Sequence, residues 1–390
     1  EDEDVSLAEA VGRVLAEDLA ADVDLPPFTR SAMDGFAVRA ADVAGPPVEL
    51  AVVDEILAGD VPHRPLATGQ ATRIMTGAPI PDGADAVVMV ERTEAPSRDR
   101  VRVLAAVEAG QNVVDAASDA RAGEVVLPAG TRLGPIAVGV AASVGRPRVR
   151  VHRRPRAVFL STGDELVEVS ATPGPGRIRN SNEWTFGAQI RAAGGVLERA
   201  EIVPDTLEAT RAAIRRGLSS DLLVLSGGVS MGEADHVARA LAEEGVEILF
   251  HKIALKPGKP LVFGRRGRTL VFGLPGNPVS SYMTFLLFVA PAVRKMTGRS
   301  DPEPRQVAAR LTGRALKRID RVQYLPAVLE ATGDGFDASP LEWHGSGDLI
   351  GVTRAGAFAI VPIGTGRIEP GEAIEVVVDD GQIGPVGRCT

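Results

Sequence analysis

The segment DLLVLSGGVSMGEAD, Asp221–Asp235, opens the region that decides the fold. An apolar run in it leads directly into a glycine-rich loop, and the same pattern returns before KPGKP at Lys256–Pro260 and GLPGNP at Gly273–Pro278. The three apolar runs are predicted to be buried strands: Leu222–Leu225, Glu247–Phe250 and Leu270–Phe272. Helix patterns follow the first and third loops. We therefore predict an open α/β sheet, mostly parallel, whose ligand lies beyond the carboxyl ends of the strands.

Together, the three loops favour an anionic ligand. Gly227–Gly228 allow the backbone to approach a ligand closely. One helix is predicted to begin near Ala234, and a long helix, Val279–Met296, to begin at Asn277–Pro278. We expect the positive ends of both helices and the two lysines of KPGKP to face one crevice.

Carboxylates follow the strand ends in the same region. Glu165 comes after the predicted strand Ala157–Leu160, Asp205 comes after Val196–Ile202, and Asp235 comes after the first glycine-rich loop. Because the carboxyl ends of parallel strands share one edge of a sheet, these acids are expected to lie together. Carboxylates beside a phosphate indicate a bridging divalent cation, most simply Mg²⁺.

Composition excludes several classes of protein. The net charge of −8 and the 4% aromatic content argue against nucleic acid as a partner. Phe285–Val293, the longest apolar stretch, is too short to span a bilayer. The one cysteine, Cys389, excludes an intramolecular disulfide. We expect a cytoplasmic protein with no membrane association; the missing initiator methionine leaves open whether residues precede Glu1.

The flanking parts of the chain are β-rich. Residues 46–126 contain short strand patterns separated by Gly, Pro and Asp, at Val48–Ile56, Gly69–Ile74, Ala86–Val90 and Arg100–Leu104. The basic run at 145–155 marks a boundary, and Asp301–Pro304 is a predicted linker. Beyond it, residues 305–390 alternate apolar and polar, which predicts a small β-sandwich or barrel.

Searches for other catalytic motifs fail. The five histidines show no zinc-binding spacing, and the sequence contains no P-loop, no GxGxxG and no GxSxG elbow. The residues alone therefore indicate a metal-assisted α/β site that handles phosphate, with β-rich attachments.

Six motifs, in this order along nearly the whole chain, carry a resemblance to a known family: SAMDGFAVR (31–39), MTGAPIPDGADAVV (75–88), STGDEL (161–166), SGGVSMGEAD (226–235), KPGKP (256–260) and GLPGNPVS (273–280). This set resembles the molybdopterin molybdenumtransferase (MoeA) family, which includes the C-terminal domain of gephyrin. The resemblance implies an enzyme that inserts molybdate into adenylylated molybdopterin with Mg²⁺-dependent release of AMP. It also implies a homodimer with a shared active site.

The same resemblance implies a four-part chain. A small domain, 1–22 and 124–154, is split by an inserted β-rich domain, 23–123. An α/β domain that binds molybdopterin, 155–300, and a C-terminal β-barrel-like domain, 301–390, follow. A molybdopterin adenylyltransferase and molybdoenzymes are possible partners.

Site residues follow position by position from the resemblance. The implied catalytic acids are Asp34, Asp119, Glu165, Asp205 and Asp235, with Asp205 and Asp235 also as the Mg²⁺ pair. The implied molybdate ligands are Lys256, Lys259, Arg321 and Ser346. The implied cofactor-binding residues are Thr76, Gly77, Ser226, Gly227, Gly228, Ser230, Gly232, Pro275, Gly276, Asn277 and Pro278.

Two departures and two alternatives remain. The family's NVRRxGED stretch reads NVVDAASD at Asn112–Asp119, so the basic neighbours of Asp119 are lost, and Pro326 stands where Arg is common. An adenylyltransferase-like enzyme with the same α/β domain is one alternative, which the β-rich parts disfavour. A non-catalytic scaffold or binding protein is the other, which the retained acids and lysines disfavour.

Overall fold

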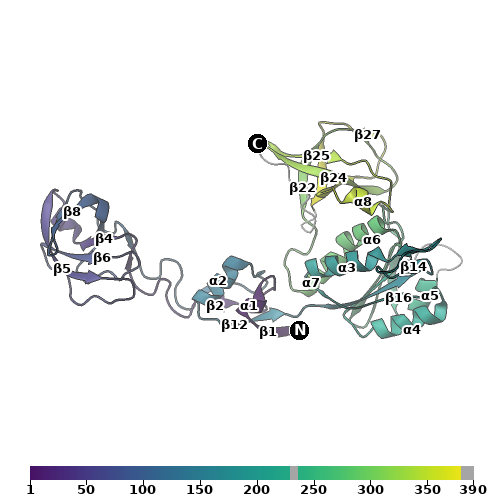
Figure 1. The fold of residues 1–390 in the computed structure, drawn as a ribbon, viewed down its shortest axis with the longest axis horizontal. Coiled ribbons are helices and arrows are strands. Elements are labelled where there is room, and N and C mark those ends of the chain that lie inside the picture. Colours follow the sequence, from purple (N-terminus) through teal and green to yellow (C-terminus); the bar gives the residue numbers. More distant parts are fainter. Residues whose placement is uncertain (229–235, 379–390) are drawn as a thin grey trace.

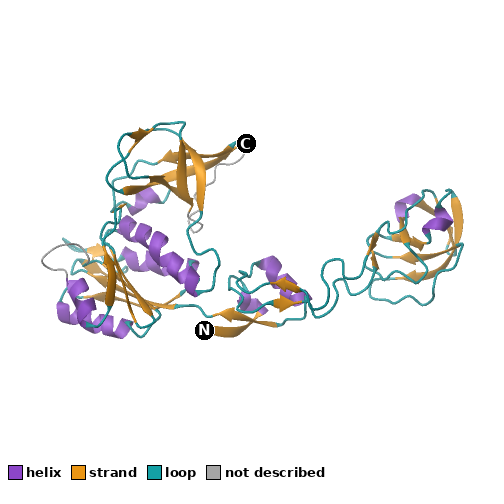
Figure 2. Cartoon of the chain, turned by 180° about the vertical axis from the view of Figure 1, so that it is seen from behind, coloured by secondary structure: helices purple, strands orange, loops and turns teal. Residues whose placement is uncertain are grey.

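The computed structural model describes residues 1–228 and 236–378, which form four parts in a long arrangement (Figure 1). A β-rich part, residues 30–114, lies at one end. A small part built from both N-terminal and middle residues follows, then an α/β part. The C-terminal strands lie beside the α/β part, next to its helices α3, α6 and α7 (Figures 1 and 2). The described residues contain no helix long and apolar enough to cross a membrane.

The α/β part is built on a six-stranded sheet in the order β16-β13-β17-β21-β20-β18. The first four strands are parallel, and β20 and β18 are antiparallel to their neighbours. The strands are β13 (Arg156–Thr162), β16 (Val196–Val203), β17 (Leu222–Ser226), β18 (Glu247–His251), β20 (Val262–Arg266) and β21 (Thr269–Leu274). The prediction of an open, mostly parallel sheet is confirmed.

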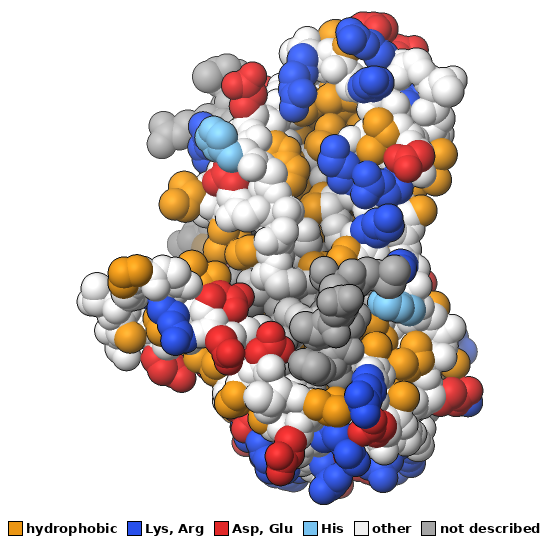
Figure 3. Space-filling model, turned by 90° about the vertical axis from the view of Figure 1, so that its right-hand side faces the viewer, with side chains coloured by type: hydrophobic (Ala, Val, Ile, Leu, Met, Phe, Trp, Pro, Cys, Tyr) orange, Lys and Arg blue, Asp and Glu red, His pale blue; other side chains and the backbone are white. Residues whose placement is uncertain are grey.

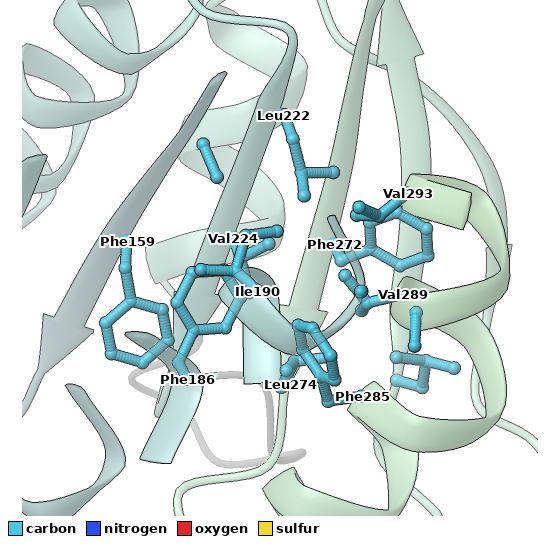
Figure 4. Packing of buried hydrophobic residues seen from close by; sticks show 14 residues of the cluster. Phe159, Phe186, Ile190, Leu222, Val224, Phe272, Leu274, Phe285, Val289 and Val293 are labelled. Atoms are coloured by element: carbon cyan, nitrogen blue, oxygen red, sulfur yellow. The ribbon is translucent and has the colours of Figure 1, made fainter. Parts of the chain in front are cut away.

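Two helical layers cover the sheet, and this explains the continuous apolar runs. Phe159 and Val224 pack with the layer of α3 (Ser181–Ala192) and α7 (Ala290–Met296), as Figure 4 shows. The alternate residues, such as Val158 and Leu223, pack with α4 (Leu207–Gly217) and α5 (His236–Glu243). Because both faces of the central strands are buried, both alternating sets of side chains are apolar.

One of the three predicted buried strands is wrong. β17 and β21 are buried as predicted, but β18 is the antiparallel edge strand and all of its residues are exposed. It pairs only with β20 within the sheet, so its apolar sequence does not reflect a central position. A short apolar run is compatible with either position, because periodicity does not report the neighbours of a strand.

The long helix after GLPGNP forms as predicted, with an interruption. Asn277 is the N-cap of α6 (Pro278–Thr284), and Pro278 is its first residue. A π-helical stretch, η3 (Phe285–Val289), joins α6 to α7, and the N–H of Ala290 bonds to the carbonyl of Phe285. Pro291 near the start of α7 explains the wider turn, because proline has no N–H for the helix ladder and crowds the preceding turn.

The small part is assembled from both sides of the inserted residues. β1 (Asp2–Ser6) pairs with β12 (Arg148–His152), and β2 (Leu19–Ala20) pairs with β11 (Val125–Leu127). Its helices are α1 (Leu7–Ala10) and α2 (Pro135–Ser143), which share one apolar core with these strands. The chain therefore leaves the small part, forms the inserted β-rich part and returns to the small part.

The inserted residues form a six-stranded sheet in the order β7-β4-β6-β5-β9-β8. Its strands are β4 (Gly35–Val38), β5 (Val48–Ile56), β6 (Gln70–Ile74), β7 (Ala86–Met89), β8 (Thr93–Ser97) and β9 (Arg100–Val103). A short pair, β3 (Arg30–Ser31) with β10 (Val113–Val114), lies beside the sheet, and the 3-10 turns are η1 (Ala40–Val43) and η2 (Val90–Arg92).

The C-terminal strands close into a barrel, as predicted. The order β24-β25-β22-β28-β26 closes through pairing of β24 with β26. The strands are β22 (Gln306–Leu311), β24 (Val322–Thr332), β25 (Gly335–Pro340), β26 (Ala357–Val361) and β28 (Ala373–Val378), with helix α8 (Leu349–Val352). The remaining short strands are β14 (Leu166–Val167) with β15 (Ile178–Arg179), β19 (Leu255–Lys256), and β23 (Leu316–Lys317) with β27 (Arg367–Ile368).

The barrel is joined to the α/β part by apolar packing and by backbone pairing. Tyr282 and Met283 of α6 share a buried cluster with Phe358 and Val377 of the barrel. β19, which contains the first lysine of KPGKP, pairs in parallel with β24 of the barrel. The KPGKP segment therefore lies where the two parts meet.

Candidate functional site

A cavity of about 460 Å³ lies at the carboxyl ends of β13 and β17. The chain runs from β13 through α3 to β16 on one side, then through α4 back to β17 on the other side of β13. The cavity is therefore at the switch point of the sheet, the usual ligand site of such folds. Nine of the residues selected from the sequence line it: Glu165, Asp205, Ser226, Gly227, Gly228, Pro275, Gly276, Asn277 and Pro278.

Gly227 and Gly228 could not be replaced without distortion. Both have positive φ, +94° and +64°. A Cβ on Gly227 would lie 2.4 Å from the carbonyl oxygen of Thr162. The backbone after β17 therefore lies directly against the end of β13, which only glycine permits.

The acids of the cavity come from two neighbouring strand ends. Asp164 and Glu165 follow β13, and Asp205 follows β16; all three are exposed. The Oδ1 of Asp164 accepts a hydrogen bond of 3.2 Å from the backbone N–H of Asp205, which holds the two loops together. Carboxylate oxygens are the ligands that Mg²⁺ prefers, so this edge suits that ion.

Three residues of the predicted site, Ser230, Gly232 and Asp235, lie outside the described residues. Among residues 1–228 and 236–378, no group of three or more His, Cys, Asp or Glu side chains is arranged to hold a metal. The prediction that Asp205 and Asp235 form a metal pair therefore stays a prediction.

The two lysines of KPGKP lie beside the cavity. Pro260 contributes to its lining, whereas Lys256 and Lys259 are exposed. The segment is held against α6, because a Cβ on Gly258 would lie 2.7 Å from Cγ2 of Thr284. Both ammonium groups are therefore presented to solvent from a fixed backbone.

Arg321 and Ser346 come from the barrel to the same junction. The backbone N–H of Val322 bonds to the carbonyl of Ala254, which places Arg321 beside the strand of Lys256. The Oγ of Ser346 accepts a hydrogen bond of 2.9 Å from Nδ2 of Asn277, and its carbonyl accepts 3.0 Å from the N–H of Val279. Asn277 thus links the cavity to the barrel.

Acidic and basic groups face each other across this side of the molecule. Figure 3 shows a group of acidic side chains on the α/β part, several basic side chains on the barrel part above it, and side chains of both signs at the bottom of the α/β part. An anionic ligand with a bridging cation suits a site with acids on one side and basic groups on the other.

Four selected residues lie elsewhere in the chain. The Oδ1 of Asp34 accepts hydrogen bonds of 2.7 Å from both the Oγ1 and the backbone N–H of Thr76. The hydroxyl hydrogen bond first, then the backbone one, lowers the pKa of Asp34. Gly77 follows with φ +85°. Asp119 lines a separate cavity of about 650 Å³ with Arg30 and Glu124.

Asp34, Thr76 and Gly77 belong to the inserted part, at the opposite end of the molecule from the α/β part, and Asp119 belongs to the connection between the inserted and small parts (Figure 1). Within one chain, Asp34, Thr76, Gly77 and Asp119 are therefore not brought to the cavity that holds Glu165 and Asp205.

Sequence reasoning missed two asparagines of the cavity. Asn180 is the N-cap of α3 and Asn182 lies on its first turn, where an asparagine needs no ligand to explain it. Both line the cavity and make hydrogen bonds to other loops. Glu183, a partner of Asn180, has its pKa raised, first by burial and then by the charge of Glu168.

Family models match three successive regions of the chain. The MoeA N-terminal region (domain I and II) matches residues 1–145, a probable molybdopterin binding domain matches 158–295, and the MoeA C-terminal region (domain IV) matches 308–378.

Whole proteins match as well. A molybdopterin molybdenumtransferase of Bacillus subtilis is 36% identical, covering 97% of this chain and 90% of the relative. One from Nostoc sp. is 36% identical, covering 96% of this chain and 88% of the relative. The crystal structure of the molybdopterin biosynthesis protein MoeA from Pyrococcus horikoshii is similar, with a TM-score of 0.83 and 31% identity over 97% of this chain and 95% of that chain. The chain belongs to the molybdopterin molybdenumtransferase (MoeA) family.

Proposed function

We propose that the protein inserts molybdenum from molybdate into adenylylated molybdopterin and releases AMP with the help of Mg²⁺. The observation that carries this proposal is the joining of two unlike sites. A cavity with glycine loops and carboxylates adjoins a junction where lysines and an arginine are held by the barrel. One site suits a pyrophosphate with a cation, and the other suits an oxyanion.

On the cavity side, we assign the phosphates to backbone groups. Gly228, Gly276 and Asn277 line the cavity, and their backbone N–H groups would meet the phosphates. The N–H groups of Gly227 and Val279 are already bonded to the carbonyls of Leu274 and Ser346. Asp205, together with Asp235 and with Glu165 nearby, would hold Mg²⁺, which when bound would neutralise charge on the phosphate oxygens. Ser230 and Gly232 would contribute from the same loop as Asp235.

On the barrel side, we assign molybdate to Lys256, Lys259, Arg321 and Ser346. Cationic side chains form strong charge-assisted hydrogen bonds with an oxyanion. Holding molybdate beside the pterin would raise its effective concentration at the dithiolene sulfurs.

We further propose a homodimer in which Asp34, Thr76, Gly77 and Asp119 serve the partner's cavity. Their distance from the cavity of their own chain supports this proposal (Figure 1). The division into a split domain (1–22 and 124–154), an inserted domain (23–123), an α/β domain (155–300) and a barrel domain (301–390) belongs to the same proposal. We also propose a cytoplasmic location. The substrate would come from a molybdopterin adenylyltransferase, and the product would pass to molybdoenzymes.

The direct test measures AMP release from adenylylated molybdopterin with and without molybdate. Asp205→Ala should release AMP at least tenfold more slowly at limiting Mg²⁺, because the cation loses a carboxylate ligand. Glu208→Ala is the matched control: Glu208 is an exposed acid on the first turn of α4, close in sequence, and does not line the cavity.

Two results would contradict the proposal. Unchanged turnover of Asp205→Ala at limiting Mg²⁺ would remove the metal assignment. Wild-type protein that forms adenylylated molybdopterin from ATP and molybdopterin, and releases no AMP with molybdate, would instead be an adenylyltransferase.

A further inference from the structure

We infer that Asn182 is a positioning residue that sets the separation of the two loops between which the pterin and its phosphates would lie. The inference rests on the proposed function, since it names a further residue that prepares the same cavity. It concerns the side-chain amide of Asn182, which the sequence marks only as part of a helix start.

The amide joins three elements at once. Nδ2 of Asn182, on the first turn of α3, donates to Oγ of Ser226 at 2.9 Å and to the carbonyl oxygen of Gly276 at 2.8 Å. Ser226 ends β17, and Gly276 lies in the loop between β21 and α6. Both protons of the amide are thus used to connect the loops on either side.

The two loops meet backbone to backbone at their glycines. A Cβ on Gly276 would lie 3.6 Å from Cα of Gly227, and the N–H of Gly227 donates to the carbonyl of Leu274 at 3.2 Å. The Oγ of Ser226 also donates to the carbonyl of Pro275, at 3.3 Å. Pairing of β17 with β21 fixes the strand ends, and the hydrogen bonds that converge on Ser226 and Gly276 fix the spacing of the loops beyond them.

The helix that carries Asn182 is itself held in place. Asn180 is 3% exposed; its Oδ1 accepts from Oγ of Ser161 at 3.1 Å, and its Nδ2 donates to Glu183 at 3.0 Å. The start of α3 is thereby fixed to the end of β13. Asn182 acts from a rigid base, as a positioning group must.

Ordinary helix capping does not explain these asparagines. A capping asparagine accepts a hydrogen bond from an N–H of the first turn. Asn180 occupies the N-cap of α3, yet its side chain makes no such bond. Asn182 donates away from the helix rather than toward it. Their amides therefore serve the cavity and not the helix end.

The test measures binding and turnover separately in the full-length protein. Asn182→Ala should raise the Kd for adenylylated molybdopterin at least tenfold, because a ligand that touches both loops then has to restore their spacing. The molybdate concentration for half-maximal AMP release should change less than twofold, since the amide of Asn182 bonds to Ser226 and Gly276 and not to the lysines or Ser346. Asn182→Ser is a second variant: serine suits a helix first turn but is too short to reach both partners, so the same binding loss is expected.

A double-mutant cycle identifies the route. If Asn182 acts partly through Ser226, the fold-increase in Kd of the double variant Asn182→Ala/Ser226→Ala should be well below the product of the fold-increases of the two single variants. Gln189→Ala is the matched control. Gln189 is an amide on the same helix that donates to the carbonyl of Tyr282 at 3.2 Å and does not line the cavity.

Three outcomes would overturn the inference. The first is a Kd within twofold of wild type for both Asn182 variants. The second is that the increases in Kd from Asn182→Ala and Ser226→Ala multiply in the double variant. The third is an equal rise in the pterin and molybdate concentrations that the protein requires, together with a lowered Tm. Binding is measured without turnover, so a wild-type protein that binds the pterin but releases no AMP would remove the proposed function and leave the test of Asn182 intact.

Discussion

Lys259 lies in a segment whose backbone is fixed at several points. Its carbonyl accepts from the N–H of Ile253 at 3.0 Å, and Gly258 next to it lies against Thr284. If Lys259 binds molybdate, Lys259→Ala should raise the molybdate requirement for AMP release at least tenfold. Loss of a charge-assisted hydrogen bond costs about 1.5–3 kcal/mol. A molybdate titration of AMP release measures the effect.

The control for this experiment is Lys295→Ala, an exposed lysine on α7 that should leave the titration unchanged. Binding of adenylylated molybdopterin to Lys259→Ala should also be unchanged. The opposite pattern, weaker pterin binding at an unaltered molybdate requirement, would assign Lys259 to the pyrophosphate instead.

At the residue scale, sequence motifs placed much of the cavity. Glu165, Asp205 and the glycine and proline loops meet there because strand ends of a parallel sheet share an edge. The role of Asn180 and Asn182 in the cavity was not predicted, because an asparagine at a helix start can either cap the helix or make tertiary hydrogen bonds. The choice depends on Ser161, Ser226 and Gly276, which are distant in sequence.

At the element scale, α4 and α5 are joined through one buried carboxylate. Glu244, 8% exposed, accepts hydrogen bonds from Nε of Arg211 at 3.0 Å and from Nε and Nη2 of Arg215 at 3.0 and 2.8 Å. The hydrogen bonds from Arg215 come first among the causes that lower the pKa of Glu244 from 4.5 to about 2.

This pair of helices gives a pH-dependent prediction. A carboxylate whose pKa is lowered on folding contributes stability above its ordinary pKa, and this contribution is lost as pH falls through the folded value. Glu244→Gln should therefore lower the Tm at pH 7. The difference from wild type should shrink as pH falls from 4.5 toward about 2. Thermal melts at pH 7, 4.5 and 3 measure it.

Glu243→Gln is the control, because Glu243 lies at the same helix end and also pairs with Arg211 but is more exposed. It should change the Tm less than Glu244→Gln does. A Tm difference between wild type and Glu244→Gln that stays constant across these pH values would show that Glu244 does not act through its charge.

Element positions were easier to predict than element neighbours. β17, β21 and the helix after Asn277 follow from apolar runs, glycine loops and an N-cap with proline. The prediction that β18 is buried was wrong because its sequence does not show its neighbours. Ile248, Leu249 and Phe250 resemble a central strand, yet they are 36%, 48% and 38% exposed, because only tertiary pairing decides which strand lies at the edge.

At the scale of the whole molecule, the connections between parts are specific. Arg153, just after β12, makes hydrogen bonds of 2.8 and 2.9 Å to both carboxylate oxygens of Asp221, just before β17. This contact links the small part to the α/β sheet and lowers the pKa of Asp221. The split of the small part came from the family resemblance and not from periodicity, because pairing of β1 with β12 spans almost 150 residues.

The same long arrangement leads to a prediction about assembly. Asp34 and Thr76 are joined by short hydrogen bonds at one end of the chain, while Glu165 and Asp205 line the cavity near the other end (Figure 1). If the Asp34 site belongs to a partner's cavity, each active site of a two-fold dimer needs both chains. Asp34→Ala and Asp205→Ala proteins, each strongly impaired alone at limiting Mg²⁺, should then recover activity when their subunits exchange.

The expected recovery follows from counting sites. Random exchange makes half of the dimers mixed, and each mixed dimer has one intact site, so activity should reach about a quarter of wild type. Asp205→Ala mixed with Glu165→Ala is the control: both changes lie in the cavity, so every site keeps one defect and no activity should return. If exchange is verified by a mass difference between subunits and the Asp34→Ala and Asp205→Ala mixture stays inactive, Asp34 does not complete a partner's cavity. A fully active Asp34→Ala protein would exclude a role for this carboxylate altogether.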